Sequence, residues 1–374
     1  MKKIQMVDLK GQYEGIKDQV NTSFQEVIEN AAFINGPEVQ QFQKDLEDYL
    51  QVKHVIPCAN GTDALQIAMM GLGLKPGDEV ITADFTFAAT VEVIALLQLT
   101  PVLVDVEPDT FNIDPEAIKK AITPKTKAIV PVHLFGQPAN MDAIMEIAEE
   151  HNLYVIEDNA QAIGGNYHSK NGKTQKTGAI GHIGATSFFP SKNLGCYGDG
   201  GAIFTNDDEM AHTIRGIVNH GMYERYHHDV VGVNSRLDSL QAAVLRAKLP
   251  KLDSYNEARK KSAVKYSEAL KGQEDVITPV LLGKEDTHVY HQYTLKIING
   301  KRDALAKHLQ EKGIPFGIYY PIPLHKQKAY VDSRYNEADF PVTNHLVQEV
   351  LSLPMHTELD DEQIEYISKT ILDF

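Results

Sequence analysis

Lys192 is the residue whose surroundings most clearly suggest chemistry. It lies between the aromatic pair Phe188-Phe189 and the glycine-rich segment 198–201, which is unlike the setting of a solvated surface lysine. Desolvation lowers the pKa of an amine, and a neutral amine is the form that makes a Schiff base with a carbonyl group. The glycines leave room for a bulky planar group. The alternative interpretation is a lysine that caps a helix or covers a phosphate.

Two other segments carry complementary groups. Asp158 directly follows the continuous apolar run 153–157, and a carboxylate at a buried strand end needs a positive partner, such as a protonated ring nitrogen. Asp158 could instead cap the next helix. The turn at Asn60-Gly61-Thr62 leads into a helical pattern, and free N–H groups there, with the Thr62 hydroxyl, can bind a phosphate. An ordinary capped turn is the alternative at this position.

The order of these segments along the chain combines them into one hypothesis. A phosphate-binding turn at Gly61 and Thr62 comes first, then the strand-end Asp158, then Lys192. Pyridoxal phosphate needs a partner for its phosphate, one for its ring nitrogen and one for its aldehyde. The sequence therefore predicts a pyridoxal phosphate site built from these residues.

The elements that must position these residues follow an alternating pattern. Between residues 52 and 220, short β-branched runs alternate with helical patterns. Continuous hydrophobicity is typical of strands buried on both faces, and strands separated by helices form a mostly parallel sheet with right-handed crossovers. Ligands bind beyond the carboxyl ends of such strands. The strands are expected at residues 54–59, 79–83, 101–106, 127–133 and 153–157.

The pattern changes after this α/β region. A long helix is expected over residues 237–270, a strand within 288–298 and a helix over 302–312. These elements are typical of a smaller α+β unit. We therefore expect a large α/β domain at residues 1–245, with an N-terminal helical segment, and a smaller C-terminal domain at residues 246–374.

Composition narrows the class of protein. The chain has 374 residues, of which 43% are hydrophobic and 23% are charged, as in ordinary globular enzymes. Its net charge of −15 disfavours binding to nucleic acid or to an anionic membrane. We expect no membrane span, no signal peptide and a cytoplasmic location. Two cysteines are too few for a disulfide framework or a four-thiolate site, and we expect no metal.

Two longer motifs carry a family resemblance. The segments 189–195 (FPSKNLG) and 232–238 (GVNSRLD) resemble the DegT/DnrJ/EryC1/StrS sugar aminotransferases, and the similarity extends from Phe33 to His356. The resemblance implies the aspartate-aminotransferase architecture, fold type I of the pyridoxal phosphate enzymes. The large domain would then hold a mostly parallel, mixed sheet of seven strands. Some relatives carry histidine in place of the Schiff-base lysine and act as dehydratases, and Lys192 argues against that branch.

The resemblance also implies roles around the cofactor ring. Lys192 matches the lysine that forms the Schiff base and shuttles the proton, and Asp158 matches the partner of the pyridine nitrogen. Gln161 matches the residue that faces the ring hydroxyl, and Phe87 matches the aromatic side chain that stacks on the ring.

Contacts to the phosphate and across a subunit boundary are implied in the same way. The residues that match phosphate contacts within one subunit are Gly61, Thr62 and Ser187. Asn234 matches a residue that reaches the phosphate from the neighbouring subunit, and Arg236 matches one beside the substrate from that same neighbour. The resemblance therefore implies a homodimer with shared active sites.

Within the family, this sequence is most similar to aminotransferases that act on a UDP-2-acetamido-2-deoxy-hexuluronic acid with a 3-keto group. Segments 58–66, 194–201, 225–228 and 320–324 carry this similarity. It implies L-glutamate as the amino donor and a 3-amino sugar acid for a surface polysaccharide of the O-antigen type. The expected substrate-binding residues are Arg236, Tyr319, Tyr320 and His325.

Departures from that subgroup leave other substrates open. Tyr319 stands where these relatives often have histidine, and Asn159 replaces a commoner alanine. An alternative substrate is a dTDP- or UDP-linked 3-keto- or 4-keto-6-deoxyhexose. Arg236 could bind a carboxylate through two hydrogen bonds or form a structural ion pair across a dimer. An alternative of another class is a non-catalytic regulatory protein that binds pyridoxal phosphate.

Overall fold

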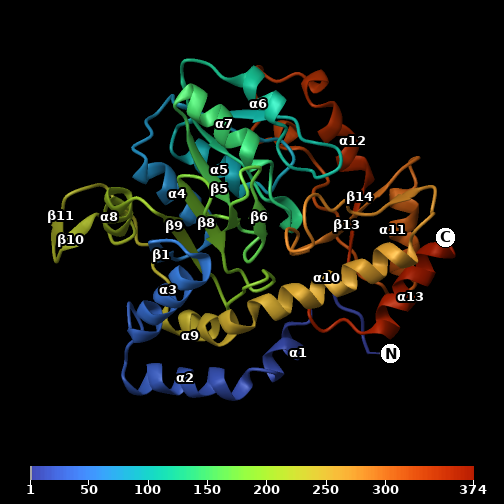
Figure 1. Cartoon of the computed structure of the whole chain (residues 1–374), viewed down its shortest axis with the longest axis horizontal. Helices are drawn as coiled ribbons and strands as arrows, with labels where there is room; N and C mark the ends of the chain where they lie inside the picture. The colour runs from blue at the N-terminus through green and yellow to red at the C-terminus, as the bar shows by residue number, and fades with distance from the viewer. Residues whose placement is uncertain (1) are drawn as a thin grey trace.

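A seven-stranded sheet lies at the centre of the computed structural model, which describes residues 2–374 (Figure 1). The strand order is β1-β9-β8-β5-β4-β2-β3, and the neighbours from β8 to β3 are parallel, whereas β9 is antiparallel to both β8 and β1. The predicted mostly parallel, mixed sheet is confirmed. Its strands are β1 (His54–Cys58), β2 (Glu79–Ala83), β3 (Thr100–Val104), β4 (Thr126–Val130), β5 (Tyr154–Asp158), β8 (Ile183–Ser187) and β9 (Gly201–Thr205).

Helices cover both faces of this sheet. Successive residues of a strand point to opposite faces. In β5, Val155 packs in a hydrophobic cluster with residues of α7, whereas Ile156 packs in another with residues of α4 and α8. Both faces are therefore buried, which explains the continuous apolar runs in the sequence. The covering helices include α4 (Gly61–Gly71), α5 (Ala89–Leu96), α6 (Pro115–Ala121), α7 (Met141–His151) and α8 (Asp208–Ile217).

Strands β8 and β9 were not predicted, because small residues such as Gly184, Ala185 and Ala202 weaken the hydrophobic signal. Close packing requires some of these small residues. A Cβ atom on Gly201, the first residue of β9, would lie 2.4 Å from the carbonyl oxygen of Asn60. Both missed strands therefore approach the turn after β1 closely, β9 at Gly201 and β8 at Ser187.

The N-terminal helices pack beside a helix from the second half of the chain. They are α1 (Leu9–Glu14), α2 (Lys17–Glu29) and α3 (Pro37–Leu50), and both α2 and α3 contact α9 (Ser239–Lys248). The prediction of one long helix over 237–270 is wrong, because a 3-10 turn at Leu249–Lys251 separates α9 from α10 (Leu252–Ala269). Pro250 lies in this turn and has no N–H group to continue an α-helix.

The C-terminal region forms a smaller sheet with its own hydrophobic cluster. Three antiparallel strands, β12 (Val276–Ile277), β13 (Tyr293–Ile297) and β14 (Val350–Leu353), pack with α10, α11 (Arg302–Glu311) and α13 (Asp361–Leu372). The strand expected within 288–298 and the helix expected over 302–312 are confirmed. The division at 245/246 falls within α9, and we keep it as a proposal.

Short elements complete the chain. The helix α12 (Pro341–Glu349) packs against the cluster of the large sheet. The remaining elements are the hairpins β6 (Asn166–His168) with β7 (Thr174–Lys176) and β10 (Met222–Glu224) with β11 (His227–His228), and the 3-10 helices η1 (Leu134–Gly136), η2 (Leu249–Lys251), η3 (Leu324–Lys326) and η4 (Glu337–Asp339).

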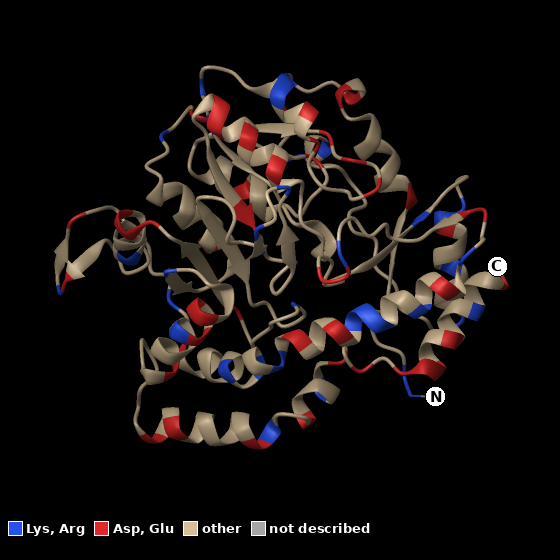
Figure 2. Ribbon diagram, viewed as in Figure 1, with Lys and Arg blue, Asp and Glu red and all other residues tan. Residues whose placement is uncertain are grey.

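The acidic residues are distributed rather than collected in one place. Figure 2 shows Asp and Glu on outer helices that include α2, α7 and α13, with Lys and Arg interspersed along α10. Within residues 2–374, no helix combines the length and the hydrophobicity needed to cross a membrane.

Candidate active site

A cavity of about 740 Å³ opens where β1, β2, β5 and β8 end, at the edge of the sheet where ligands bind in α/β folds. Segments that follow these strands form most of its wall, and residues from the C-terminal half complete it. The predicted site residues that line it are Gly61, Thr62, Phe87, Asp158, Gln161, Ser187, Lys192, Tyr319 and Tyr320.

The turn after β1 brings the first turn of α4 against the end of β8. Oδ1 of Asn60 caps α4 by accepting a hydrogen bond from the backbone N–H of Asp63 at 2.8 Å. A Cβ atom on Gly61 would lie 2.6 Å from Cβ of Ser187, so glycine is required there. The N–H groups of a first helical turn lack helical partners, and Thr62 and Ser187 both line the cavity. This arrangement suits a phosphate.

Asp158 lies at the end of β5 with its carboxylate held from two sides. Oδ2 accepts a hydrogen bond from Oγ1 of Thr90 at 2.9 Å, and Oδ1 accepts one from the backbone N–H of Ala160 at 3.2 Å. Burial raises the pKa of Asp158, although these hydrogen bonds and the nearby Lys192 act in the opposite direction. The buried carboxylate can therefore bind a further positive group in the cavity.

Lys192 follows β8 in a loop that is held by several hydrogen bonds. Its backbone N–H donates to the carbonyl of Phe189 at 2.8 Å, and Nζ of Lys248 donates to the carbonyl of Gly195 at 2.7 Å. Burial lowers the pKa of Lys192 to about 8, and the charge of Asp158 opposes this shift. Roughly a tenth of this amine is therefore neutral at pH 7, far more than of an ordinary lysine, and the neutral form is the one that carbonyl chemistry requires.

Gln161 and two aromatic residues form another part of the wall. Oε1 of Gln161 accepts a hydrogen bond from the backbone N–H of Phe135 at 2.7 Å, and its Nε2 donates to the hydroxyl of Tyr320 at 3.3 Å. The ring of Phe87 is 57% exposed and lies 6.2 Å from the ring of Tyr320. An aromatic side chain that is open to the cavity can stack on a planar ligand.

Asn234 and Arg236 do not line this cavity. Asn234 is exposed and Arg236 is half-buried. Between them, Oγ of Ser235 accepts a hydrogen bond from the backbone N–H of Ala59 at 3.0 Å, so the segment lies beside the turn after β1. Their predicted roles concern the active site of a neighbouring subunit and stay predictions.

His325 also lies outside the cavity lining. It is buried, and its Nδ1 lies 2.6 Å from Oδ2 of Asp84. Its Nε2 is sealed inside the protein without a hydrogen-bond partner in residues 2–374. The predicted contact between His325 and a substrate stays a prediction, and the observed contact is with Asp84.

Sequence reasoning missed several residues of the wall. Thr86, Asp199, His291 and Gln292 also line the cavity. Thr86 and Asp199 are close in sequence to predicted site residues and could have been found from that proximity. His291 and Gln292 lie just before β13 in the second half of the chain, where no motif pointed to a site.

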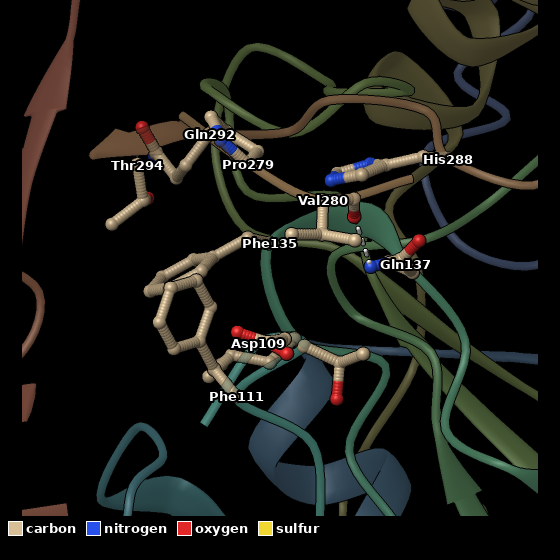
Figure 3. Close-up of a pocket in the computed structure, with 11 residues that line it drawn as sticks. Asp109, Phe111, Phe135, Gln137, Pro279, Val280, His288, Gln292 and Thr294 are labelled. Atoms are coloured by element: carbon tan, nitrogen blue, oxygen red, sulfur yellow. Dashed lines mark hydrogen bonds between the residues drawn. The ribbon is translucent and has the colours of Figure 1, made fainter. Parts of the chain in front are cut away.

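A second, much smaller cavity lies behind Phe135 and Gln292, which line both cavities. Figure 3 shows the rings of Phe111 and Phe135 near each other and the side chain of Gln137 directed at Val280, whose carbonyl accepts its hydrogen bond at 3.0 Å. The volume is about 10 Å³, which is room for one water molecule at most. This cavity is therefore too small for a substrate.

The large cavity fits pyridoxal phosphate by the groups it presents. It offers the amine of Lys192 for an aldehyde, the buried carboxylate of Asp158 for a protonated pyridine nitrogen, and the helix start at Gly61 for a phosphate. All three line one space, although they come from distant parts of the chain.

Curated relatives resemble the chain along nearly its whole length. A UDP-2-acetamido-2-deoxy-3-oxo-D-glucuronate aminotransferase from Pseudomonas aeruginosa is 48% identical over 97% of this chain and 98% of the relative. A protein from Geobacillus stearothermophilus named as a pleiotropic regulatory protein is 47% identical over 99% and 98%. A UDP-N-acetyl-3-dehydro-alpha-D-glucosamine 3-aminotransferase from Acidithiobacillus ferrooxidans is 44% identical over 98% and 97%.

Solved structures confirm the predicted architecture. S. venezuelae DesV, solved with a ketimine intermediate, superposes with a TM-score of 0.94 at 37% identity, covering 100% of this chain and 98% of DesV. NtdA from Bacillus subtilis, solved with the cofactor PMP, has a TM-score of 0.92 at 32% identity, covering 100% and 85%. PMP is the amine form of pyridoxal phosphate, and pyridoxal phosphate is the cofactor of this enzyme as well. Residues 14–372 match one family model, and the chain belongs to the DegT/DnrJ/EryC1/StrS aminotransferase family.

Proposed function

We propose that this enzyme transfers an amino group from L-glutamate to C3 of UDP-2-acetamido-2-deoxy-ribo-hex-3-uluronic acid, for a surface polysaccharide of the O-antigen type. The observation that carries the proposal is the single cavity lined by Lys192 and Asp158. The choice of sugar is supported by the names of two relatives, both of which aminate C3 of a UDP-linked sugar.

The cavity residues have distinct roles in this proposal. When bound, the cofactor supplies a ring that accepts the electron pair released when the donor's Cα–H bond breaks. Asp158 keeps the proton on the pyridine nitrogen, since its buried carboxylate is stabilised by a positive partner. Nζ of Lys192 takes the proton from Cα of the amino donor. Gln161 faces the ring hydroxyl, and Phe87 stacks on the ring.

The phosphate and the substrate are held by residues of two subunits in this proposal. Gly61, Thr62 and Ser187 bind the phosphate within one subunit, and Asn234 reaches it from a second copy of the chain. Arg236 of the second copy binds a carboxylate, either of the sugar or of glutamate. The enzyme is therefore proposed to act as a homodimer with shared active sites. Tyr319 and Tyr320 line the cavity where the sugar would lie.

The central test measures glutamate-dependent amination of a panel of UDP- and dTDP-linked keto-sugars, with product mass as the readout. The UDP-3-keto-uronic acid should be aminated most efficiently. Borohydride should attach the cofactor to Lys192, and Lys192→Ala should abolish turnover, whereas Lys173→Ala, at an exposed lysine, should not change it. Turnover of glutamate and keto-sugar by Lys192→Ala would contradict the mechanism.

A second candidate substrate is a dTDP- or UDP-linked 3-keto- or 4-keto-6-deoxyhexose. Tyr319 favours it, because this phenol lines the cavity and, unlike a protonated histidine, offers no positive charge to a C6 carboxylate. Preference for a neutral 6-deoxy sugar over the matching uronic acid would replace the first choice. Arg236→Met should reduce turnover of the uronic acid more than that of the neutral sugar if Arg236 binds the C6 carboxylate.

A regulatory protein without turnover is the candidate of another class, and the name of the relative from Geobacillus stearothermophilus favours testing it. The distinguishing experiment adds glutamate alone and follows the cofactor's absorbance. Conversion of the cofactor to its amine form would eliminate the regulatory alternative.

A further inference from the structure

His291 lines the cavity together with Lys192, yet none of the roles proposed above uses it. Its side chain is only 6% exposed, and its Nδ1 lies 3.3 Å from Oδ1 of Asn193, the residue directly after Lys192. A buried histidine that is linked to the lysine loop and also reaches the cavity is a candidate for a further part in the reaction.

Backbone carbonyl groups determine how this hydrogen-bond network is oriented. A carbonyl oxygen can only accept, so Nδ2 of Asn256 must donate to Ile163 at 3.2 Å, which leaves Oδ1 of Asn256 toward Asn193. Nδ2 of Asn193 donates to that oxygen at 2.7 Å and to the carbonyl of Val289 at 3.0 Å. Oδ1 of Asn193 therefore faces His291 as an acceptor.

This orientation specifies the tautomer of the histidine. Because Oδ1 of Asn193 accepts, Nδ1 of His291 must carry the hydrogen, and Nε2 of a neutral ring then has a free lone pair. Burial holds the pKa of His291 well below its usual range, and the positive charges of Lys192 and Arg259 add to this effect. The ring is therefore neutral at physiological pH.

The free lone pair opens toward the cavity. Within the described residues, Nε2 of His325 is buried and has no hydrogen-bond partner. Nε2 of His291 does not belong to this class of buried, unpartnered atoms. Since His291 lines the cavity and its Nδ1 is directed at Asn193, Nε2 is the polar atom that it presents there. The acceptor is fixed in place, while the long side chain of Lys192 can move.

We infer that His291 is a positioning residue, whose Nε2 accepts a hydrogen bond from the protonated amine of Lys192 while that amine is not bound to the cofactor. The inference rests on the proposed function, in which Nζ of Lys192 takes up the donor's proton. A neutral acceptor stabilises the ammonium form of Lys192. It adds no negative charge that would compete with Asp158 for this ammonium group. The other charged groups that act on the pair are Asp158, which faces Lys192, and Arg259 on α10, which faces His291.

Two substitutions separate a positioning role from a purely structural one. His291→Asn places an amide near the position of Nδ1, so it can keep the bond to Asn193 but has no acceptor at the position of Nε2. His291→Gln extends its amide to the position of Nε2, so it restores an acceptor and loses the bond to Asn193. A structural role makes Gln the more damaging change, whereas a positioning role makes Asn the more damaging one.

The first readout uses the apoprotein and no sugar. The pH dependence of labelling of Lys192 by an amine-reactive anhydride, resolved by mass spectrometry, reports its pKa, which is about 8 in the unsubstituted protein. His291→Asn should lower this pKa by about one unit, because it removes a hydrogen bond to the charged form. His291→Gln should restore most of the shift. An unchanged pKa in His291→Asn, or equal shifts in both variants, would overturn the inference.

Two further measurements support or overturn the same point. Nitrogen NMR of the unsubstituted apoprotein should show hydrogen on Nδ1 of His291, and hydrogen on Nε2 would overturn the inference. In the glutamate half-reaction, His291→Asn should lower the rate about tenfold with little change in glutamate KM. A change in KM alone would assign His291 to substrate binding and overturn the positioning role. Failure of the unsubstituted enzyme to transaminate would instead contradict the proposed function.

Discussion

Asp84 and His325 form a buried pair in which one carboxylate accepts two hydrogen bonds from one histidine. The backbone N–H of His325 donates to Oδ1 at 2.7 Å, and Nδ1 lies 2.6 Å from Oδ2. The backbone of Asp84 also accepts from Leu324 at 3.2 Å. Because Asp84 precedes Phe87 by three residues and His325 follows Tyr320 by five, the pair joins the two segments whose aromatic rings line the cavity.

We predict that Asp84→Ala strongly destabilises the protein. The change leaves two buried donors of His325 without an acceptor, which should lower the free energy of unfolding by about 3 kcal/mol. Urea denaturation followed by circular dichroism measures this difference. Asp84→Asn, which keeps one acceptor and the same shape, should cost less than Asp84→Ala. Equal stability of Asp84→Ala and the unsubstituted protein would show that the pair does not join the segments energetically.

Glu157 should have a structural role, although it directly precedes Asp158. It is fully buried and accepts hydrogen bonds from Nε2 of His133 and from three backbone N–H groups, those of Gly178, Ile180 and Gly181. Glu157→Gln turns one acceptor oxygen into a donor that faces other donors, so it should lower the free energy of unfolding by roughly 2–4 kcal/mol.

The control for this prediction is Glu150→Gln, at an exposed position of α7, which should leave stability unchanged. If the two variants unfold at the same urea concentration, the hydrogen bonds to Glu157 contribute nothing measurable.

Asp158→Asn should separate cofactor binding from turnover. The amide keeps the size and the hydrogen bond to Thr90 but cannot hold a proton on the pyridine nitrogen by its charge. The cofactor should therefore remain bound, while kcat should fall at least about 100-fold. Absorbance and steady-state kinetics measure the two effects. Thr90→Ser keeps the hydroxyl and serves as the control, and near-normal turnover by Asp158→Asn would remove the proposed role.

Lys248 gives a prediction about pH. Burial lowers the pKa of this lysine to about 8 from a usual 10.5, so between these values the folded protein releases a proton that the unfolded chain keeps. Its contribution to stability should therefore rise as the pH increases from 8 to 10 and should be constant below 8. The difference in unfolding free energy between the unsubstituted protein and Lys248→Met, measured across this range, isolates the effect. A difference that falls with pH would contradict it.

The cavity could be predicted largely from sequence because its main signals are local. Gly61 follows a predicted strand, Asp158 ends another, and Lys192 is marked by its aromatic and glycine neighbours. Residues at the carboxyl ends of parallel strands meet at one edge of a sheet. The structure also separates Glu157 from Asp158 by strand alternation, which places neighbouring side chains on opposite faces. The sequence already assigned Asp158 to the site, and the structure adds that Glu157 instead accepts hydrogen bonds from His133 and from backbone N–H groups.

Other features depend on contacts between distant segments and could not be predicted. His291 is brought to Lys192 through Asn193 and Asn256, and none of these links has a sequence pattern. His325 was expected beside a substrate, yet the contact that its side chain makes in the structure is with the carboxylate of Asp84. Pairings of this kind arise from the packing of the C-terminal region on the large sheet, which hydrophobic periodicity does not describe.

The contribution of Tyr319 and Tyr320 to the cavity wall has a consequence for biosynthesis. When the ribosome has translated the chain through α9, the nascent polypeptide already contains Lys192, Asp158 and the turn at Gly61. The wall that closes the cavity is still missing at that moment. Binding of pyridoxal phosphate in the complete cavity must therefore wait until translation is almost finished.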